Sequence, residues 1–182
     1  PYITGDYRIL METPELLIEG LNIVLDMFPK AKGIIGIEDN KKDAIAKVEA
    51  LVKGDARISV ATLKTKYPQG AERSLIYATT GRSINSSMLP ADAGCIVDNV
   101  ATIVAIKEAV KDGKPLYERV VTVTGDAIKN PSNFKVRTGT NVQELIEAAG
   151  GFKTQPEKII SGGPMMGMAM SVSYTHLTLP TT

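Results

Sequence analysis

The stretch Tyr67-Pro68-Gln69-Gly70 has residue types that suit a small-molecule site, because it lies where a predicted strand gives way to a predicted helix. Backbone N–H groups and the positive end of the helix dipole at such a place can face an anion or an electron-rich ring oxygen. The structural alternative is a tight turn made rigid by the proline, with Glu72 complementing the dipole of the first helical turn. From these residues alone both interpretations stay open.

Two lysines precede this stretch. Lys64 and Lys66 are two residues apart and share one face if the strand continues to them. Their charges would attract the phosphates of a dinucleotide. Lysines at such positions are more often solvated charges at a sheet edge, so this second interpretation also stays open.

A further polar group follows the short apolar run Cys95-Ile96-Val97 and opens another predicted helix. Ligands of open α/β sheets bind just beyond the carboxyl ends of the strands, so Val97, Asn99 and Thr102 are candidate ligand contacts. The alternative is that Asp98 or Asn99 caps the helix. A carboxylate at position 98 would repel a phosphate, which argues against direct phosphate contact there.

Composition excludes several other classes of protein. The 182 residues are 43% apolar and 23% charged, with a formal net charge of +1 and no basic stripe, so a nucleic-acid partner is not expected. No run of about 18 apolar residues is present. The only histidine, His176, has no nearby Cys, Asp or Glu in sequence, and this excludes a metal site and Ser-His-Asp chemistry. The only cysteine, Cys95, fits a reducing cytoplasm.

The periodicity predicts an α/β domain at residues 1–115 and a second, smaller domain at 116–170. In the first domain we expect strands at 33–37, 57–63 and 95–97. Helices should alternate with them, at 14–28, at 44–51, in a segment ending at Gly81 and at 99–111, and this alternation predicts a parallel sheet. In the second we expect a hairpin at 120–124 and 134–137, a helix over 140–149 with a capping box from Thr140 to Gln143, and a strand at 158–160.

Both ends of the chain have unusual sequence. Pro1 in place of an initiator Met indicates that the sequence begins inside a longer protein. The glycine-rich stretch 162–167 is predicted to be a flexible turn whose methionines pack against a core. Residues 171–182, rich in Thr and Ser, are expected to be foreign to the native protein and loosely attached, the alternative being a real edge strand.

Separate stretches along the chain resemble, in order and at similar spacing, the C subunit of the Rnf ion-translocating electron transport complex. The resemblance covers residues 1 to about 170, extends more distantly to the NADH-binding flavoprotein subunit of complex I, and is carried by Ile37-Glu38-Asp39-Asn40-Lys41, Leu63-Lys64-Thr65-Lys66-Tyr67-Pro68-Gln69-Gly70, Leu89-Pro90-Ala91-Asp92-Ala93-Gly94, Val121-Thr122-Val123-Thr124-Gly125-Asp126-Ala127 and Ser161-Gly162-Gly163-Pro164-Met165-Met166-Gly167.

This resemblance implies a Rossmann-like FMN- and NADH-binding domain, incomplete at its N-terminus, followed by a β-grasp soluble-ligand-binding domain. It places Tyr67 beside the flavin, Gly70 at a close backbone approach and Glu72 near the nicotinamide. It also adds Val97, Asn99 and Thr102 to the flavin contacts, while Lys64 remains the candidate for the dinucleotide phosphates.

The resemblance further implies a subunit that moves electrons between NADH and ferredoxin through FMN and 4Fe-4S clusters, in a complex that translocates ions. Its partners would be the other subunits, at the cytoplasmic face of the bacterial inner membrane. The flavin phosphate loop would lie upstream of Pro1 and the cluster cysteines beyond Met170, so residues 1–182 alone are expected to be inactive.

This sequence departs from its relatives at a few positions. Relatives generally have Asn where Asp98 stands and glycines at Ser86-Ser87. The complex I subunit has two consecutive acids after the glycine, where this chain has Gly70-Ala71-Glu72, so it is the less favoured relative. A non-catalytic ligand- or partner-binding scaffold module is the alternative from another class.

Overall fold

A computed structural model describes residues 3–163 and 166–170. The chain divides into two compact units. The first, the α/β unit, is Asp6–Pro115, and the second, the hairpin unit, combines residues 3–5 with the described residues from Leu116 onward. Residues 171–182, for which a foreign tail is predicted, lie outside the described residues.

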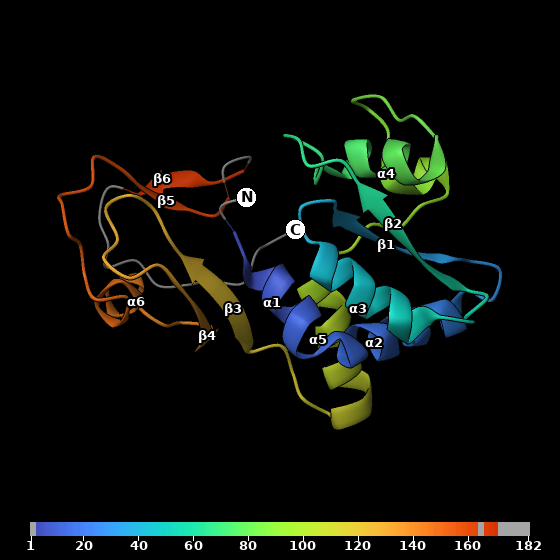
Figure 1. The fold of residues 1–182 in the computed structure, drawn as a ribbon, viewed down its shortest axis with the longest axis horizontal. Coiled ribbons are helices and arrows are strands. Elements are labelled where there is room, and N and C mark those ends of the chain that lie inside the picture. Colours follow the sequence, from blue (N-terminus) through green and yellow to red (C-terminus); the bar gives the residue numbers. More distant parts are fainter. Residues whose placement is uncertain (1–2, 164–165, 171–182) are drawn as a thin grey trace. The chain divides into compact units, whose positions relative to one another are not determined.

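The α/β unit has helices around a two-stranded parallel sheet (Figure 1). Its elements in chain order are α1 (Gly5–Glu12), α2 (Pro14–Met27), β1 (Gly33–Glu38), α3 (Lys42–Val52), β2 (Ile58–Leu63), α4 (Glu72–Thr80), the 3-10 helix η1 (Pro90–Ala93) and α5 (Val100–Asp112). The strands pair in register from Gly33 with Ile58 to Glu38 with Leu63, which confirms the predicted parallel sheet.

Helical spacing explains why α2 and α3 form. Proline stands at the first turn of α2, where its missing N–H costs nothing, and Leu17 and Leu25 of that helix are buried. In α3 the buried residues Ala44, Val48 and Val52 recur every four positions and make one apolar stripe. The stripes join the sheet in one core, formed by Leu10, Leu17, Leu25, Ile35, Ile37, Ala44, Val48, Val52, Ile58 and Ile103.

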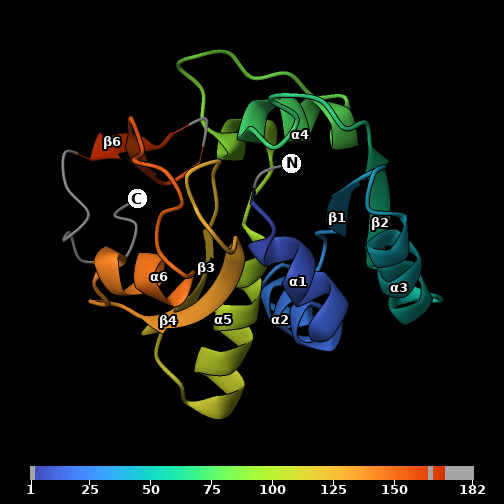
Figure 2. The same cartoon turned by 60° about the vertical axis from the view of Figure 1, so that its left-hand side comes forward.

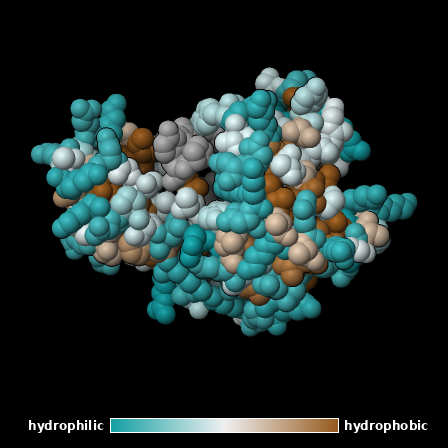
Figure 3. Space-filling view, in the orientation of Figure 1, coloured by the Kyte–Doolittle hydropathy of each residue, from teal (hydrophilic) through white to brown (hydrophobic). Residues whose placement is uncertain are grey.

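The two faces of the sheet differ. Ile35 and Ile37 of β1 are buried in the core, whereas Ile34, which points to the opposite face, is 42% exposed. Figure 3 shows hydrophobic side chains gathered over the place where β1 and β2 lie in Figure 1. A Cβ at Gly36 would meet Leu63 at 2.9 Å and Leu75 of α4 at 3.0 Å, so α4 packs closely on the second face.

The strand predicted at 95–97 is wrong. Residues 95–99 belong to no helix or strand, and Ile96 is 65% exposed. Gly94 ends η1 in the left-handed region with φ of 65°, and the chain then runs directly to Asn99 without pairing to β1 or β2. An apolar run of three residues was too short to distinguish a buried strand from an extended connection.

The hairpin unit begins with the antiparallel pair β3 (Glu118–Val123) and β4 (Ser132–Arg137), followed by α6 (Val142–Ala148) and the short antiparallel pair β5 (Ile159–Ser161) and β6 (Met168–Met170). Its core is the small cluster of Ile128, Ile146 and Ala149, against which Val123, Phe134 and Val142 pack. The predicted fold class, an α/β domain with a parallel sheet and a small second domain, is therefore confirmed.

Two local predictions in this unit are wrong. Asn141, and not Thr140, caps α6, because its side-chain oxygen accepts from the Gln143 amide at 2.8 Å. The Thr140 hydroxyl instead donates to the Arg137 carbonyl at 2.7 Å. Met166 is 89% exposed and does not pack against a core, while Met165 lies outside the described residues.

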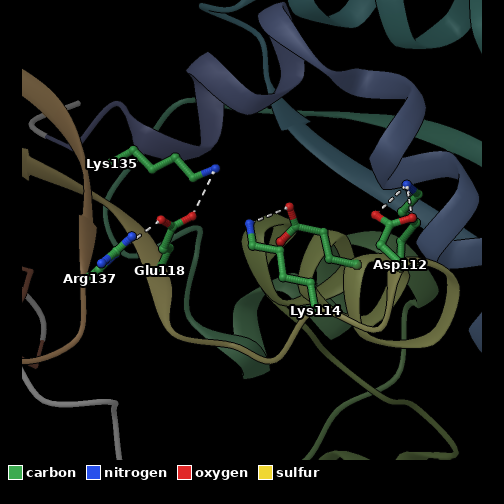
Figure 4. A network of polar contacts seen from close by, with 7 residues as sticks. Asp112, Lys114, Glu118, Lys135 and Arg137 are labelled. Carbon is green, nitrogen blue, oxygen red and sulfur yellow. Dashed lines mark hydrogen bonds and ion pairs between the residues drawn. The ribbon is translucent and has the colours of Figure 1, made fainter.

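One face of the β3–β4 hairpin carries polar contacts. Lys135 and Arg137 of β4 both reach the Glu118 carboxylate of β3, at 3.3 and 3.9 Å (Figure 4). Farther along, Thr4 and Asn133 exchange hydrogen bonds of 2.9 and 3.2 Å, and Thr122 donates to Asn133 at 2.6 Å. Residues near the N-terminus are thus part of the hairpin unit, which the sequence did not predict.

Candidate functional site

The carboxyl ends of β1 and β2 are joined by a side-chain clamp. The Asp39 carboxylate accepts hydrogen bonds from the Thr65 hydroxyl at 2.6 Å and the Thr65 amide at 3.1 Å, and the Asp39 amide donates to the Leu63 carbonyl. These bonds hold the pKa of Asp39 below its ordinary value, and the nearby Lys64 and Lys42 lower it further. Lys64 therefore lies beside a carboxylate and does not stand alone.

Residues 67–72, here named the 67–72 turn, lead from this clamp into α4. Tyr67 is 65% exposed and its peptide bond to Pro68 is cis. Gln69 is buried at 5% exposed, while a Cβ at Gly70 would meet no protein atom within 4 Å. The turn thus offers an exposed aromatic ring next to open space.

The first turn of α4 has no side-chain cap. Its N-cap residue is Ala71, and Glu72 is the first helical residue. The first N–H groups of a helix need acceptors from outside the helix, and alanine cannot provide one. The first N–H groups of α4 can therefore donate hydrogen bonds to an anion or to a carbonyl oxygen of a ligand.

Asn99 opens α5 as its N-cap. The side-chain oxygen accepts from the Ala101 amide at 2.8 Å, and the side-chain nitrogen donates to Asp6 of α1 at 2.7 Å. The predicted capping role is therefore present, and Asn99 rather than Asp98 fills it. One amide hydrogen of Asn99 is not accounted for by these two bonds, since its NH₂ group carries two donors. Thr102, in the first turn of α5, is half-buried.

The predicted site residues fall into groups at the ends of elements. Lys64, Tyr67, Gly70 and Glu72 follow β2 in one continuous segment, and Val97, Asn99 and Thr102 stand at the start of α5. Within the described residues, Asn99 bonds Asp6, and Thr65, which lies inside the first segment, bonds Asp39; these side-chain bonds do not join the two groups to each other. The connection between them runs through the segment that links α4 to α5.

Comparison with known families decides what kind of domain this is. The family model of the Nuo51 FMN-binding domain matches residues 1–108. The chain belongs to this family. A second model, that of the SLBB domain, matches residues 120–169 and so covers most of the β3–β4 hairpin together with α6 and β5.

Curated relatives of this Nuo51-type chain support the same assignment. It is 47% identical over 173 residues to the C subunit of the Na(+)-translocating ferredoxin:NAD(+) oxidoreductase complex of Acetobacterium woodii, covering 95% of this chain and 39% of the relative. It is 48% identical over 171 residues to the C subunit of the proton-translocating ferredoxin:NAD(+) oxidoreductase complex of Clostridium ljungdahlii, covering 94% and 37%. The C subunit of the ion-translocating oxidoreductase complex of Yersinia pestis is 42% identical over 171 residues, covering 93% and 27%.

The resemblance predicted from the sequence is thereby confirmed. The chain spans about two fifths or less of the length of these relatives. The FMN-binding model covers most of the α/β unit, which contains the exposed turn and the uncapped helix start.

Sequence reasoning missed Asp6, Asp39 and Gln69 as residues that shape the site. Asp39 and Gln69 lie inside stretches that carry the family resemblance, which was an available signal. Asp6 gave no such signal, because its contact with Asn99 joins positions far apart in the chain.

Clusters of metal-ligating side chains and helices long and apolar enough to span a membrane are both absent from the described part of the chain. No group of at least three His, Cys, Asp or Glu residues there could hold a metal ion. No helix in residues 3–163 and 166–170 is long and apolar enough to cross a membrane.

Proposed function

We propose that this chain is the flavin-carrying part of the C subunit of an ion-translocating ferredoxin:NAD oxidoreductase complex. The observation that carries the proposal is the 67–72 turn, which presents an exposed ring, open space at Gly70 and an uncapped helix start within a Nuo51-type domain. The names of the relatives supply ferredoxin and NAD as the reaction partners of the whole complex.

The residues present fit FMN. The Tyr67 ring is exposed for contact with an isoalloxazine face, since no protein side chain needs to leave it first. The Gly70 backbone can approach a ring edge closely because a Cβ is absent there and nothing else fills the space. Bound FMN would exchange a hydride with NADH and single electrons with iron–sulfur clusters.

Polar groups at the start of α5 suit the ribityl chain and the phosphate. The second amide hydrogen of Asn99 and the hydroxyl of Thr102 can donate to ribityl hydroxyls or to a phosphate oxygen. The Asp6 carboxylate oxygen lies 2.7 Å from the Asn99 side-chain nitrogen. Because this carboxylate would repel a phosphate, Asn99 is better suited to bind a ribityl hydroxyl. Val97 precedes these residues and would contribute backbone contact.

Charged residues complete the proposed NADH side. Glu72 at the first position of α4 is exposed, which suits a polar contact with the nicotinamide carboxamide. Lys64 would attract the phosphates of the dinucleotide, and the neighbouring Asp39 carboxylate would weaken that attraction. The full-length protein would carry the 4Fe-4S clusters outside these residues, because Cys95 is the only cysteine here. It would lie peripherally at the cytoplasmic face of the membrane, bound to the other subunits.

The test uses full-length protein reconstituted with FMN. We expect flavin absorbance that bleaches on addition of NADH, and a loss of FMN affinity of about tenfold in Tyr67→Ala, the scale of a stacked ring contact. Tyr77→Ala is the matched control, since Tyr77 is 62% exposed against 65% for Tyr67 and lies on α4.

Two results would contradict the proposal. Full-length protein that takes up no FMN would support the alternative of a scaffold or ligand-binding module. Equal FMN affinities for the two tyrosine variants would show that the Tyr67 ring makes no flavin contact.

A further inference from the structure

The segment between α4 and α5, residues 83–94 and here named the 83–94 loop, is tied to both ends of α4 by arginines. In the first turn of α4, Arg73 Nη2 donates to the Ser86 carbonyl at 3.0 Å. Directly after the helix, Arg82 Nη1 donates to the Ala93 carbonyl at 2.7 Å. Figures 1 and 2 both show this loop beside α4.

Side-chain hydrogen bonds cross-link the 83–94 loop at two places. The Asn85 side-chain oxygen accepts from the Ser87 amide at 2.9 Å and the Ser87 hydroxyl at 2.7 Å. The Asp92 carboxylate accepts from the Leu89 amide at 2.8 Å and so closes η1. These bonds shape two parts of the loop, and the two arginine bonds attach it to α4.

The attachment at Arg82 is closely fitted. Gly94 has a φ of 65°, and a Cβ there would lie 3.3 Å from Arg82 Nη1. A side chain at position 94 would therefore be strained in the left-handed region and would also crowd the guanidinium. Arg82 reaches across the base of the loop to a carbonyl next to this glycine.

Asn99, at the far end of the route from the loop into α5, is held by its bond to Asp6 and by α5, whose Ile103 belongs to the core. Residues 95–99 form no strand and pair with neither β1 nor β2. The loop therefore links this fixed point to α4, which begins at Glu72 directly after the 67–72 turn and contributes no residue to the large core.

We propose that Arg73 and Arg82 are positioning residues that hold the 83–94 loop on α4 and thereby set the spacing between the 67–72 turn and Asn99. This inference rests on the proposed function, since it assigns these two groups to one flavin site. The arginines act through the loop and do not touch the cofactor.

Loss of a positioning contact should affect FMN affinity and the melting temperature differently from loss of an ordinary stabilising contact. Both arginines are exposed, and exposed charged contacts add little to global stability because solvent screens them. Misplacing a binding group by a small distance, in contrast, weakens the ligand complex directly. Removal of these side chains should change FMN affinity much more than it changes the melting temperature.

The experiment uses full-length protein and compares Arg73→Ala, Arg82→Ala and the double variant with wild type. We expect the FMN dissociation constant to rise roughly three- to tenfold in the double variant, with the melting temperature within about 2 °C of wild type. Arg82→Lys should restore most of the affinity, because one N–H donor is enough to reach the Ala93 carbonyl.

Arg57→Ala is the matched control. Arg57 bonds Asn22 and Asp26 of α2 at 2.8 Å and precedes β2, at the amino end of the sheet and away from the proposed site. We expect it to lower the melting temperature at least as much as the double variant does, with an unchanged FMN dissociation constant.

The outcomes separate this inference from the proposed function. Wild-type protein without FMN would refute both. Wild-type FMN binding, with the double variant within twofold of it, would refute only the positioning role. An affinity loss in Arg57→Ala equal to that of the double variant would refute it as well, because general destabilisation would then explain the result.

Discussion

The α/β unit and the hairpin unit are held together in different ways. The core of the α/β unit draws buried residues from α1, α2, α3, α5, β1 and β2. The hairpin unit buries a small cluster around Ile146 and relies in addition on polar contacts across one face of β3 and β4. Buried apolar area is the main source of stability, so the two units should respond differently to the same type of substitution.

The comparison also bears on where the proposed binding groups lie. Tyr67 and Gly70 follow β2, and Asn99 opens α5; each of these elements places a buried residue, Ile58 and Ile103, in the large core. A rigid scaffold can present exposed side chains in fixed positions without using them for its own stability. Substitutions in the two units, and at packed and exposed positions of one unit, should therefore have separable effects.

The largest effect is expected in the hairpin unit. Ile146→Ala removes one of the few fully packed side chains there, where Ile146 is 4% exposed, and should cost about 3 kcal/mol of unfolding free energy. Hydrogen exchange of the full chain should show lost protection over 118–161. Ile160→Ala, at a residue that is 56% exposed, is the control and should change little. Similar losses in the two variants would show that the small cluster is not the core of this unit.

The next largest effect is expected at a glycine of the α/β unit that is packed against a neighbouring helix. A Cβ at Gly20 of α2 would lie 2.1 Å from the Ile103 carbonyl oxygen of α5, so Gly20→Ala must force the helices apart. We expect a loss of about 2 kcal/mol in urea unfolding, in the range of overpacked cores.

Gly70→Ala is the counterpart of that substitution. No protein atom lies within 4 Å of the added methyl group, and the unfolding free energy should stay within about 0.5 kcal/mol of wild type. The same substitution should weaken FMN binding in the full-length protein, because the methyl group would enter the proposed ligand space. Unfolding losses of the same size at positions 20 and 70 would contradict the distinction.

Much of the fold could be predicted from the sequence, because helical and strand periodicity is local. The stripe of Ala44, Val48 and Val52 predicted α3, and the β-branched run at 33–37 predicted β1. The short run at 95–97 was ambiguous, and only its exposure in the structure shows that it is a connection. Cap choice between Thr140 and Asn141 depends on backbone geometry that residue types do not determine.

The candidate site was predictable only in part. Residue types and family resemblance indicated Tyr67, Gly70 and Asn99 as candidates, which stays a prediction, but they could not indicate contacts between distant positions. Asp6 reaches Asn99, and Thr4 reaches Asn133, across long stretches of chain. Side-chain hydrogen bonds of this kind leave no periodic signal, so no pattern in a single sequence reports them.

A smaller effect should follow from removing the polar tie of the hairpin unit. Thr122→Val keeps the shape but deletes the hydroxyl that accepts from the Thr4 amide at 3.3 Å and donates to Asn133 at 2.6 Å. We expect a loss of about 1 kcal/mol and faster exchange of the Thr4 amide. Ser132→Ala, which removes only an exposed bond to the Asn130 carbonyl, is the control. Unchanged exchange at Thr4 would show that the contact does not hold residues 3–5.

The smallest effect concerns the clamp between Asp39 and Thr65 at the carboxyl ends of β1 and β2. The pKa of Asp39 is lowered, first by the Thr65 hydroxyl and then by the Thr65 amide. A lowered folded-state pKa means that the clamp contributes stability above the ordinary aspartate pKa of about 3.9, and that this contribution is lost as the pH falls through the folded-state pKa. Thr65→Val removes the hydroxyl and leaves the amide, so the pKa of Asp39 should rise part of the way to its ordinary value.

Carboxyl NMR titration of the full chain measures that shift directly. Asp43 is the internal reference, because its pKa is lowered by the Tyr7 hydroxyl and the Ala44 amide and not by Thr65. The stability difference between wild type and Thr65→Val should be present at neutral pH and shrink in strong acid, where the Asp39 carboxyl is protonated in both proteins. An Asp39 titration that the variant leaves unchanged would mean that the hydroxyl does not hold the carboxylate in solution. A change in the pKa of Asp43 equal to that of Asp39 would instead indicate a general change of the α/β unit. The clamp between Asp39 and Thr65 would then not be what aligns the carboxyl ends of β1 and β2.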